Sequence, residues 1–175
     1  MNLILSLTEQ CNLRCTYCYY KESHKERIAV MNDDVLEASL RLSLDRTIEL
    51  RQSFLNITFF GGEPLLRLES IHRGTNYIKK LVKKRRSELP KDFELKFAIN
   101  TNGTLLTEDI LNFLEQEKFE IFLSLDGTAK RHNTNRKKIN GRGCFNKIKP
   151  HLFRLAKMNT TILSVVPQEN HVGLE

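Results

Sequence analysis

The stretch "LILSLTEQCNLRCTYC" (residues 3–18) joins an apolar run to three closely spaced cysteines. The run over 3–8 indicates a β-strand that ends just before Cys11. Cys11, Cys15 and Cys18 follow the spacing C-x3-C-x2-C, which differs from the C-x2-C pairs usual in structural zinc sites. Thiolates are the ligands of iron–sulfur clusters, and three of them would leave the fourth iron of a cubane open. The stretch therefore predicts a strand that carries a metal site at its carboxyl end.

Two other readings of the three cysteines stay open. One is a zinc site completed by His24, and the other is a set of unliganded thiols. The fourth cysteine, Cys144, lies between Gly143 and Phe145 at an expected helix start. We interpret it as a small buried residue.

Composition indicates an ordinary globular domain. The 175 residues are 40% apolar and 28% charged, which suits one folded domain that buries a core. No window approaches 18 consecutive apolar residues, so no membrane span is expected. The N-terminal apolar run has no basic region before it and no small-residue cleavage site after it. A cytosolic, reducing location is the default expectation.

Apolar strand-like runs alternate with amphipathic helical segments. Asn32 or Asp33 is a suitable cap for the first helix, and Thr107 is one for the third. This alternation predicts βαβ units on a parallel sheet. Because the sequence stops just after a fifth strand, we expect a truncated piece of a longer protein. The expected strands are 3–8, 54–60, 93–99, 119–125 and 160–166, and the expected helices are near 33–51, 68–88, 108–117 and 144–157.

A distinctive loop follows each of the first four strands. After the cysteine stretch come "GGEP" (61–64), "NTNG" (100–103) and "SLDG" (124–127). The carboxyl ends of parallel strands lie at one face, so the four loops are predicted to converge there. Each of the last three is also explained as a turn, above all Asp126–Gly127.

The net charge of +7 raises the question of a nucleic-acid partner. Six positive charges lie in "KKLVKKRR" (79–86), where Ile78, Leu81 and Val82 fall at helical spacing. The solvated face of an amphipathic helix explains these charges, and a patch for an acidic peptide or nucleic acid is the alternative.

Together, the cysteine motif, "GGEPLL", "TNGTLL" and "SLDG…H…R" resemble the radical S-adenosylmethionine (SAM) superfamily. The resemblance runs from Leu3 to about Val166 and is strongest to anaerobic sulfatase-maturating enzymes and peptide maturases with a SPASM domain. It implies an α/β fold, a partial (βα)6 barrel with about five parallel strands and helices outside. The whole chain, 1–175, would be a truncated radical SAM core without the auxiliary-cluster domain.

The resemblance also implies cofactors and the residues that hold them. Cys11, Cys15 and Cys18 would ligate a 4Fe–4S cluster whose open iron chelates SAM. Tyr17 matches the family's aromatic position beside the adenine. Four residues match the motif that receives the SAM amino group: Gly61, Gly62, Glu63 and Pro64.

Three further residues belong to the implied site. Asn102 would line it, and Ser124 and Arg136 match positions that hydrogen-bond the SAM carboxylate or ribose. The chain departs from the family where relatives usually have His-Asp before that arginine, because it has His132–Asn133. A carboxylate is lost there. No general base is identifiable in the sequence.

The implied activity is reductive cleavage of SAM to a 5′-deoxyadenosyl radical that modifies a peptide or protein side chain. An external donor such as flavodoxin or ferredoxin would supply the electron. Two alternatives stay open. The first is a truncated remnant that binds a cluster or a partner without turnover, and the second is a zinc-stapled nucleic-acid-binding module.

Overall fold

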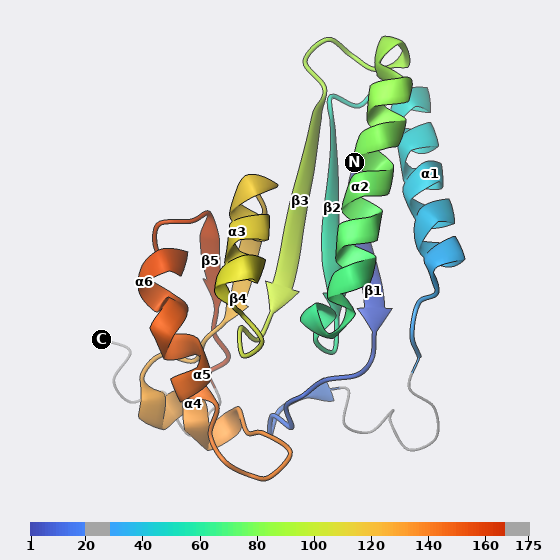
Figure 1. Cartoon of the computed structure of the whole chain (residues 1–175). Coiled ribbons are helices and arrows are strands. Elements are labelled where there is room, and N and C mark those ends of the chain that lie inside the picture. Colours follow the sequence, from blue (N-terminus) through green and yellow to red (C-terminus); the bar gives the residue numbers. More distant parts are fainter. Residues whose placement is uncertain (20–28, 167–175) are drawn as a thin grey trace.

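The computed structural model describes residues 1–19 and 29–166, and they contain one parallel sheet (Figure 1). Its strand order is β1-β2-β3-β4-β5, so each strand pairs with its neighbour in sequence. All the carboxyl ends therefore lie along one edge. The strands are β1 (Asn2–Thr8), β2 (Phe54–Gly61), β3 (Glu94–Thr101), β4 (Glu120–Ser124) and β5 (Thr160–Leu163).

Three long helices connect the first four strands: α1 (Asp33–Glu49), α2 (Leu68–Lys84) and α3 (Glu108–Gln116). The predicted caps are confirmed. The Asn32 side chain accepts a hydrogen bond from the Val35 amide at 2.8 Å, and Thr107 does the same for Ile110 at 3.3 Å. Both helices also have acidic residues in their first turns. These negative charges stabilise the helices because the N-terminal end of a helix dipole is positive.

The sequential strand order puts the helices on one side of the sheet. Parallel crossovers are right-handed, so strands that follow one another in a single direction send every helix to the same face. Along β1, Leu5 and Leu7 are buried against the helices, whereas Ile4 points the other way and is 67% exposed. Among residues 1–19 and 29–166, no helix covers the opposite face of the sheet, as in a barrel that is partly open.

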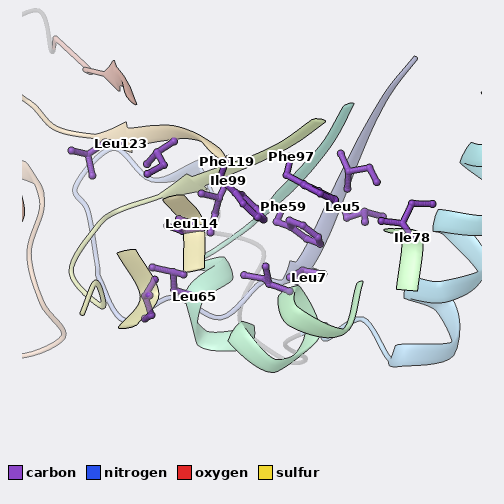
Figure 2. Close-up of a cluster of buried hydrophobic side chains, with 14 of the residues drawn as sticks. Leu5, Leu7, Phe59, Leu65, Ile78, Phe97, Ile99, Leu114, Phe119 and Leu123 are labelled. Atoms are coloured by element: carbon purple, nitrogen blue, oxygen red, sulfur yellow. The ribbon is translucent and has the colours of Figure 1, made fainter. Parts of the chain in front are cut away.

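The core lies between the sheet and the helices (Figure 2). Three phenylalanines form its centre: Phe119 packs 6.0 Å from Phe59 and 5.3 Å from Phe97 between ring centroids. Leu40 of α1 is fully buried and would contact any side chain larger than a hydrogen at Gly74 of α2. This close helix–helix contact fixes α2, and with it the loop at the end of β2.

The region after β4 is less regular than predicted. The short helix α4 (Ala129–Asn135) was not predicted, because its mostly polar residues give no apolar periodicity. The helix predicted near 144–157 is helical over 145–155 but is not one continuous α-helix. The segment is divided because Pro150 has no amide hydrogen and cannot continue an α-helix. It consists of α5 (Phe145–Ile148), the 3₁₀ turn η4 (Lys149–His151) and α6 (Leu152–Leu155).

The other boundaries shift by small amounts. The predicted helix 68–88 ends as α2 at Lys84 and is followed by the 3₁₀ turn η3 (Arg86–Glu88). A further 3₁₀ turn, η2 (Pro64–Arg67), follows β2. β5 covers only the first part of the predicted 160–166.

Within residues 1–19 and 29–166, every helix is too short or too polar to cross a lipid bilayer.

Replacing Leu40 with alanine should lower the free energy of unfolding by about 2–5 kcal/mol, because it opens a cavity at the contact between α1 and α2. The matched control is Leu42→Ala on the same helix, where the side chain is 68% exposed and the change should stay within about 0.5 kcal/mol. Urea unfolding of both variants measures the difference. Equal losses would show that α1 does not pack as described.

Candidate functional site

The cysteine loop (residues 11–18) begins three residues after β1. Cys11, Cys15 and Cys18 are free thiols, each partly exposed, and the Cys18 amide donates to the Cys15 carbonyl at 3.2 Å. The sulfur of Cys11 receives two N–H groups, from the Leu13 amide at 3.4 Å and from Asn102 Nδ2 at 3.8 Å. Hydrogen bonds of this kind stabilise a thiolate.

The GGEP loop lies directly against the start of the cysteine loop. The Gly62 amide donates to the Thr8 carbonyl at 2.7 Å, and the Glu63 amide donates to the Gln10 carbonyl at 2.8 Å. A Cβ atom on Gly61 would lie 2.3 Å from the Thr8 oxygen, and one on Gly62 would lie 2.3 Å from the Gln10 oxygen. Gly61 also has a φ of 142°. Only glycine permits this approach of two backbones.

The carboxylate of Glu63 is fully buried and connects two loops. It accepts hydrogen bonds from the Leu65 amide at 3.1 Å, from the Thr101 hydroxyl at 2.7 Å and from the Asn102 amide at 2.8 Å. Burial raises the pKa of Glu63 to about 7, although the three donors act in the opposite direction. The side chain therefore joins the end of β2 to the end of β3.

The side chain of Asn102 continues this connection to the cysteine loop. Its Oδ1 accepts from the amide and the hydroxyl of Thr104 at 2.9 and 2.6 Å. The amide orientation follows, because a backbone N–H only donates. Nδ2 consequently faces Asn12 Oδ1, at 2.9 Å, and the sulfur of Cys11. Asn102 thus contacts two residues of the cysteine loop.

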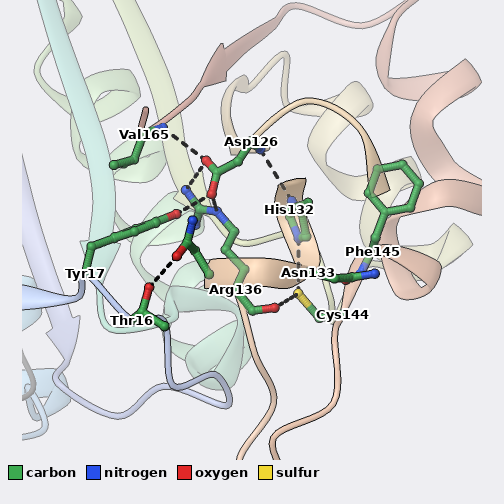
Figure 3. A network of polar contacts seen from close by, with 10 residues as sticks. Thr16, Tyr17, Asp126, His132, Asn133, Arg136, Cys144, Phe145 and Val165 are labelled. Atoms are coloured by element: carbon green, nitrogen blue, oxygen red, sulfur yellow. Dashed lines mark hydrogen bonds and ion pairs between the residues drawn. The ribbon is translucent and has the colours of Figure 1, made fainter. Parts of the chain in front are cut away.

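Asp126, which follows β4, is the centre of a second network (Figure 3). Its buried carboxylate pairs with Arg136 through Nε at 2.9 Å and Nη2 at 3.1 Å. It also accepts from the Tyr17 hydroxyl and, at 3.0 Å, from the Val165 amide. Burial alone would raise the pKa of Asp126, but hydrogen bonds from Arg136, Tyr17 and Val165 together hold that pKa below its usual value. One carboxylate therefore links the cysteine loop to the ends of β4 and β5.

Tyr17 and Arg136 are in contact with each other. The Arg136 guanidinium carbon lies 5.4 Å from the centre of the Tyr17 ring, a cation–π arrangement. Burial and the bond to Asp126 raise the pKa of Tyr17, so its hydroxyl is protonated at neutral pH. Ser124, also predicted to contact SAM, ends β4 in register with Leu163 of β5.

A buried histidine supports this network from α4. His132 Nδ1 accepts from the Asp126 amide at 3.4 Å, and Nε2 lies 3.1 Å from the sulfur of Cys144. Cys144 is 1% exposed, which confirms its prediction as a buried residue. Asn133, at the position where relatives usually have Asp, accepts from the Phe145 amide at 2.9 Å and so stabilises the start of α5.

The four predicted loops therefore do converge, through Gly62, Glu63, Asn102 and Asp126. From the sequence, Asp126–Gly127 was explained equally well as a tight turn, and Asp126 was not among the predicted site residues. The pattern "SLDG…H…R" contained the signal, because a carboxylate so close to an arginine suggests a pair. His132 was noted only as a family match.

Within the described part of the chain, no three His, Cys, Asp or Glu side chains are arranged as ligands of one metal ion. A cubane cluster does not require its ligands to converge on one ion, because each cysteine binds a separate iron. Three free thiols in one loop, with N–H donors on Cys11, fit such a cluster chemically. Burial raises the pKa of Cys15 to about 11 although Arg136 acts to lower it, so metal binding must release protons. His24, the ligand of the zinc alternative, lies outside the described residues.

The raised pKa of Glu63 predicts a pH-dependent stability. A carboxyl group whose pKa is about 7 when folded and 4.5 otherwise stabilises the fold fully below pH 4.5 and loses that contribution as the pH rises through 7. The loss is on the order of 3 kcal/mol. Urea unfolding between pH 4.5 and 8 should show it in the wild type and not in Glu63→Gln. The exposed Glu69→Gln serves as the control and should keep the wild-type slope.

Several known proteins are similar to this chain in sequence and fold. The chain is 34% identical over 170 residues to the cysteine-type anaerobic sulfatase-maturating enzyme of Clostridium perfringens, covering 94% of this chain and 43% of the relative. It is 30% identical over 151 residues to the serine-type enzyme of Bacteroides thetaiotaomicron, covering 84% of this chain and 34% of the relative. The chain thus spans less than half the length of these relatives.

Structure and family comparisons agree with those relatives. The solved structure of native anSMEcpe with bound AdoMet, which is SAM, superposes with a TM-score of 0.73 at 31% identity, over 94% of this chain and 44% of that one. The sheet and its helices are therefore part of a radical SAM barrel, and this family uses a 4Fe–4S cluster and SAM. The sequence model described as "Radical SAM superfamily" matches residues 5–172. By sequence, by fold and by its cysteine loop, this chain belongs to the radical SAM superfamily.

Proposed function

We propose that this chain is the core of a radical SAM enzyme that modifies a peptide or protein side chain. Cys11, Cys15 and Cys18 would hold a 4Fe–4S cluster, and SAM would bind beside it. The observation that carries the proposal is the contact of the GGEP loop with Thr8 and Gln10, which lead into the cysteine loop, at 2.7 and 2.8 Å between backbone atoms. When bound, the cluster supplies the electron that cleaves SAM to a 5′-deoxyadenosyl radical.

The residues around the cysteine loop have separate tasks in this proposal. Gly61 and Gly62 bring backbone carbonyls to the SAM ammonium group, because no side chain obstructs them. Pro64 begins η2 and ends the loop. The Glu63 carboxylate is fully buried and accepts hydrogen bonds from Thr101 and Asn102, so it is directed away from the proposed SAM site. It positions the loop without contacting SAM.

Arg136 and Tyr17 form the opposite side of the proposed SAM site, together with Asn102 and Ser124. Two nitrogens of Arg136, Nε and Nη2, bind Asp126. Its Nη1 makes no hydrogen bond within residues 1–19 and 29–166, and this group is the donor we assign to the SAM carboxylate or ribose. The pair with Asp126 thus holds the guanidinium in place for an anionic ligand. Tyr17 would provide a flat face for the adenine.

A relative supports the proposed substrate class. A structure of native anSMEcpe holds AdoMet and a peptide together, and it superposes on this chain with a TM-score of 0.72 at 32% identity. In this chain, the uncovered face of the sheet presents the partly buried rings of Phe60 and Phe122. We propose that a peptide side chain reaches the SAM site across this face.

The remaining features of the proposal concern the whole protein. Residues 1–175 form one radical SAM core domain in a reducing, cytosolic environment, where clustered thiols persist. A separate protein such as ferredoxin or flavodoxin supplies the electron. A second candidate is a cluster-binding chain without turnover.

The first test is anaerobic reconstitution with iron and sulfide. Wild-type chain should bind about four irons and become brown, and the alanine variants at Cys11, Cys15 and Cys18 should each lose most of this iron, because three thiolates are the minimum for an open cubane. Cys144→Ala is the control and should load normally. Full loading of all four variants would refute the proposed ligands.

Turnover of the same sample separates the two candidates. With dithionite and SAM, the enzyme should release 5′-deoxyadenosine, measured by chromatography. A fully loaded chain that gives none would support the candidate without turnover.

The second test concerns the close backbone contact. Gly62→Ala places a methyl group against the Gln10 carbonyl and forces the loops apart, so the Kd for SAM should rise by at least about tenfold. Gly141→Ala is the control, because that position has a positive φ but no atom within 4 Å of a Cβ. Calorimetric titration of both loaded variants measures the effect. Wild-type affinity in Gly62→Ala would contradict the proposed site.

A further inference from the structure

The charge excess of the chain has a second location besides α2. From Gly127 to Pro150 the sequence has eight Lys and Arg residues and no Asp or Glu. We call residues 127–150 the basic segment. The net charge of the whole chain is +7, so the rest of the chain is nearly balanced.

Of the six positive charges at residues 79–86, two form ion pairs with described residues, and Lys80, Lys83 and Lys84 are exposed, as on a solvated helix face. Lys79 binds Glu117 at 2.7 Å, and Arg85 binds Asp45 and Glu88. These contacts agree with the interpretation of "KKLVKKRR" as the solvated face of an amphipathic helix.

The basic segment likewise has several cations without an ion pair, but it lies beside the cysteine loop. Arg136 pairs with Asp126, but the side chains of Lys137, Lys138 and Arg142 form no ion pair with any residue of the described ranges. Lys130, Lys147 and Lys149 are likewise unpaired there, and all three are exposed. Their positive charge is therefore available to attract an anionic partner at the surface. Burial raises the pKa of the Cys144 thiol, and the positive charges of Arg136 and Lys138 act to lower it.

The basic segment lies side by side with the cysteine loop. The Arg14 amide donates to the Lys137 carbonyl at 2.6 Å, and an antiparallel bridge joins Leu13 to Lys138. The guanidinium of Arg14 itself donates to the carbonyls of Cys11 and Leu13 at 2.8 Å each. Positive charge therefore surrounds the half-exposed loop that would hold the cluster. Figure 1 shows this loop near α4 and α5, below the strand ends.

From this placement we infer that Arg14, Lys137, Lys138 and Arg142 form the docking surface for an acidic electron-transfer protein. The inference rests on the proposed function, which needs one electron from outside for each cleavage of SAM. In that step the donor protein loses one electron and the group held by the three cysteines gains it, with no transfer of atoms. Opposite charges accelerate such encounters, and they bring the donor to the side of the chain where the electron enters.

The test compares two triple charge reversals in the iron-loaded chain. Lys137→Glu, Lys138→Glu and Arg142→Glu change the docking surface. Lys80→Glu, Lys83→Glu and Lys84→Glu make the same change of charge on the exposed face of α2, whose C-terminal half lies at the opposite end of the strands. Stopped-flow absorbance follows reduction of each protein by prereduced, acidic [2Fe–2S] ferredoxin at low and high salt. Dithionite is the second reductant, since it needs no docking surface.

At low salt, ferredoxin should reduce the docking-surface variant at least about tenfold more slowly than wild type. High salt should lower the wild-type rate to nearly that of the variant, because it screens the charges. The α2 variant should stay within about twofold of wild type. All three proteins should react equally with dithionite. Equal slowing of both variants, or a wild-type rate without salt dependence, would overturn the inference.

Failure of the proposed function gives a different result. A wild-type chain that binds no iron would refute the function, and association of the iron-free chain with immobilised ferredoxin would still test the surface. Binding to an RNA oligonucleotide that depends on the same three residues, with no binding to ferredoxin, would assign the surface to nucleic acid instead.

Discussion

The site depends on one buried carboxylate that connects the ends of neighbouring strands. Glu63 leaves the end of β2, binds the Thr101 hydroxyl and the Asn102 amide at the end of β3, and thereby fixes the amide that faces the sulfur of Cys11. Its position requires that the GGEP loop touch the backbone after β1, which glycine alone permits. The start of the cysteine loop is thus stabilised by hydrogen bonds from Asn102, which Glu63 positions.

Charges at this face of the sheet are divided between two roles. The buried pair of Asp126 and Arg136 is nearly neutral as a unit, and removing either partner would leave a buried charge unpaired. Its function is geometric, since it joins the cysteine loop, α4 and the end of β5. Lys137, Lys138 and Arg142 of the basic segment form no ion pair with the described residues, so their field extends into solvent. The first group orders the site, and the second is placed to act on partners.

Much of the fold was predictable because apolar periodicity and turn residues are local signals. All five strands, the three long helices and the convergence of four loops follow from them. The pair of Asp126 with the nearby Arg136 was open to prediction, whereas its bond to Tyr17 joins residues 109 apart in the sequence and gives no local signal. The small α4 has no apolar stripe to reveal it, whereas the break at Pro150 was legible in the sequence and was overlooked. The roles of individual residues towards SAM come from family resemblance, which the contacts of Arg136 and Glu63 refine.

The central claim is that three thiols from one loop leave one iron of a cluster open to SAM. Electron paramagnetic resonance of the reduced, anaerobically reconstituted chain, recorded with and without SAM, tests this claim most directly. We predict the signal of a single 4Fe–4S cluster whose g-values change when SAM is added, because SAM becomes a ligand of the open iron. A cluster signal that SAM leaves unchanged, or the absence of a cluster signal from the intact chain, would contradict the account.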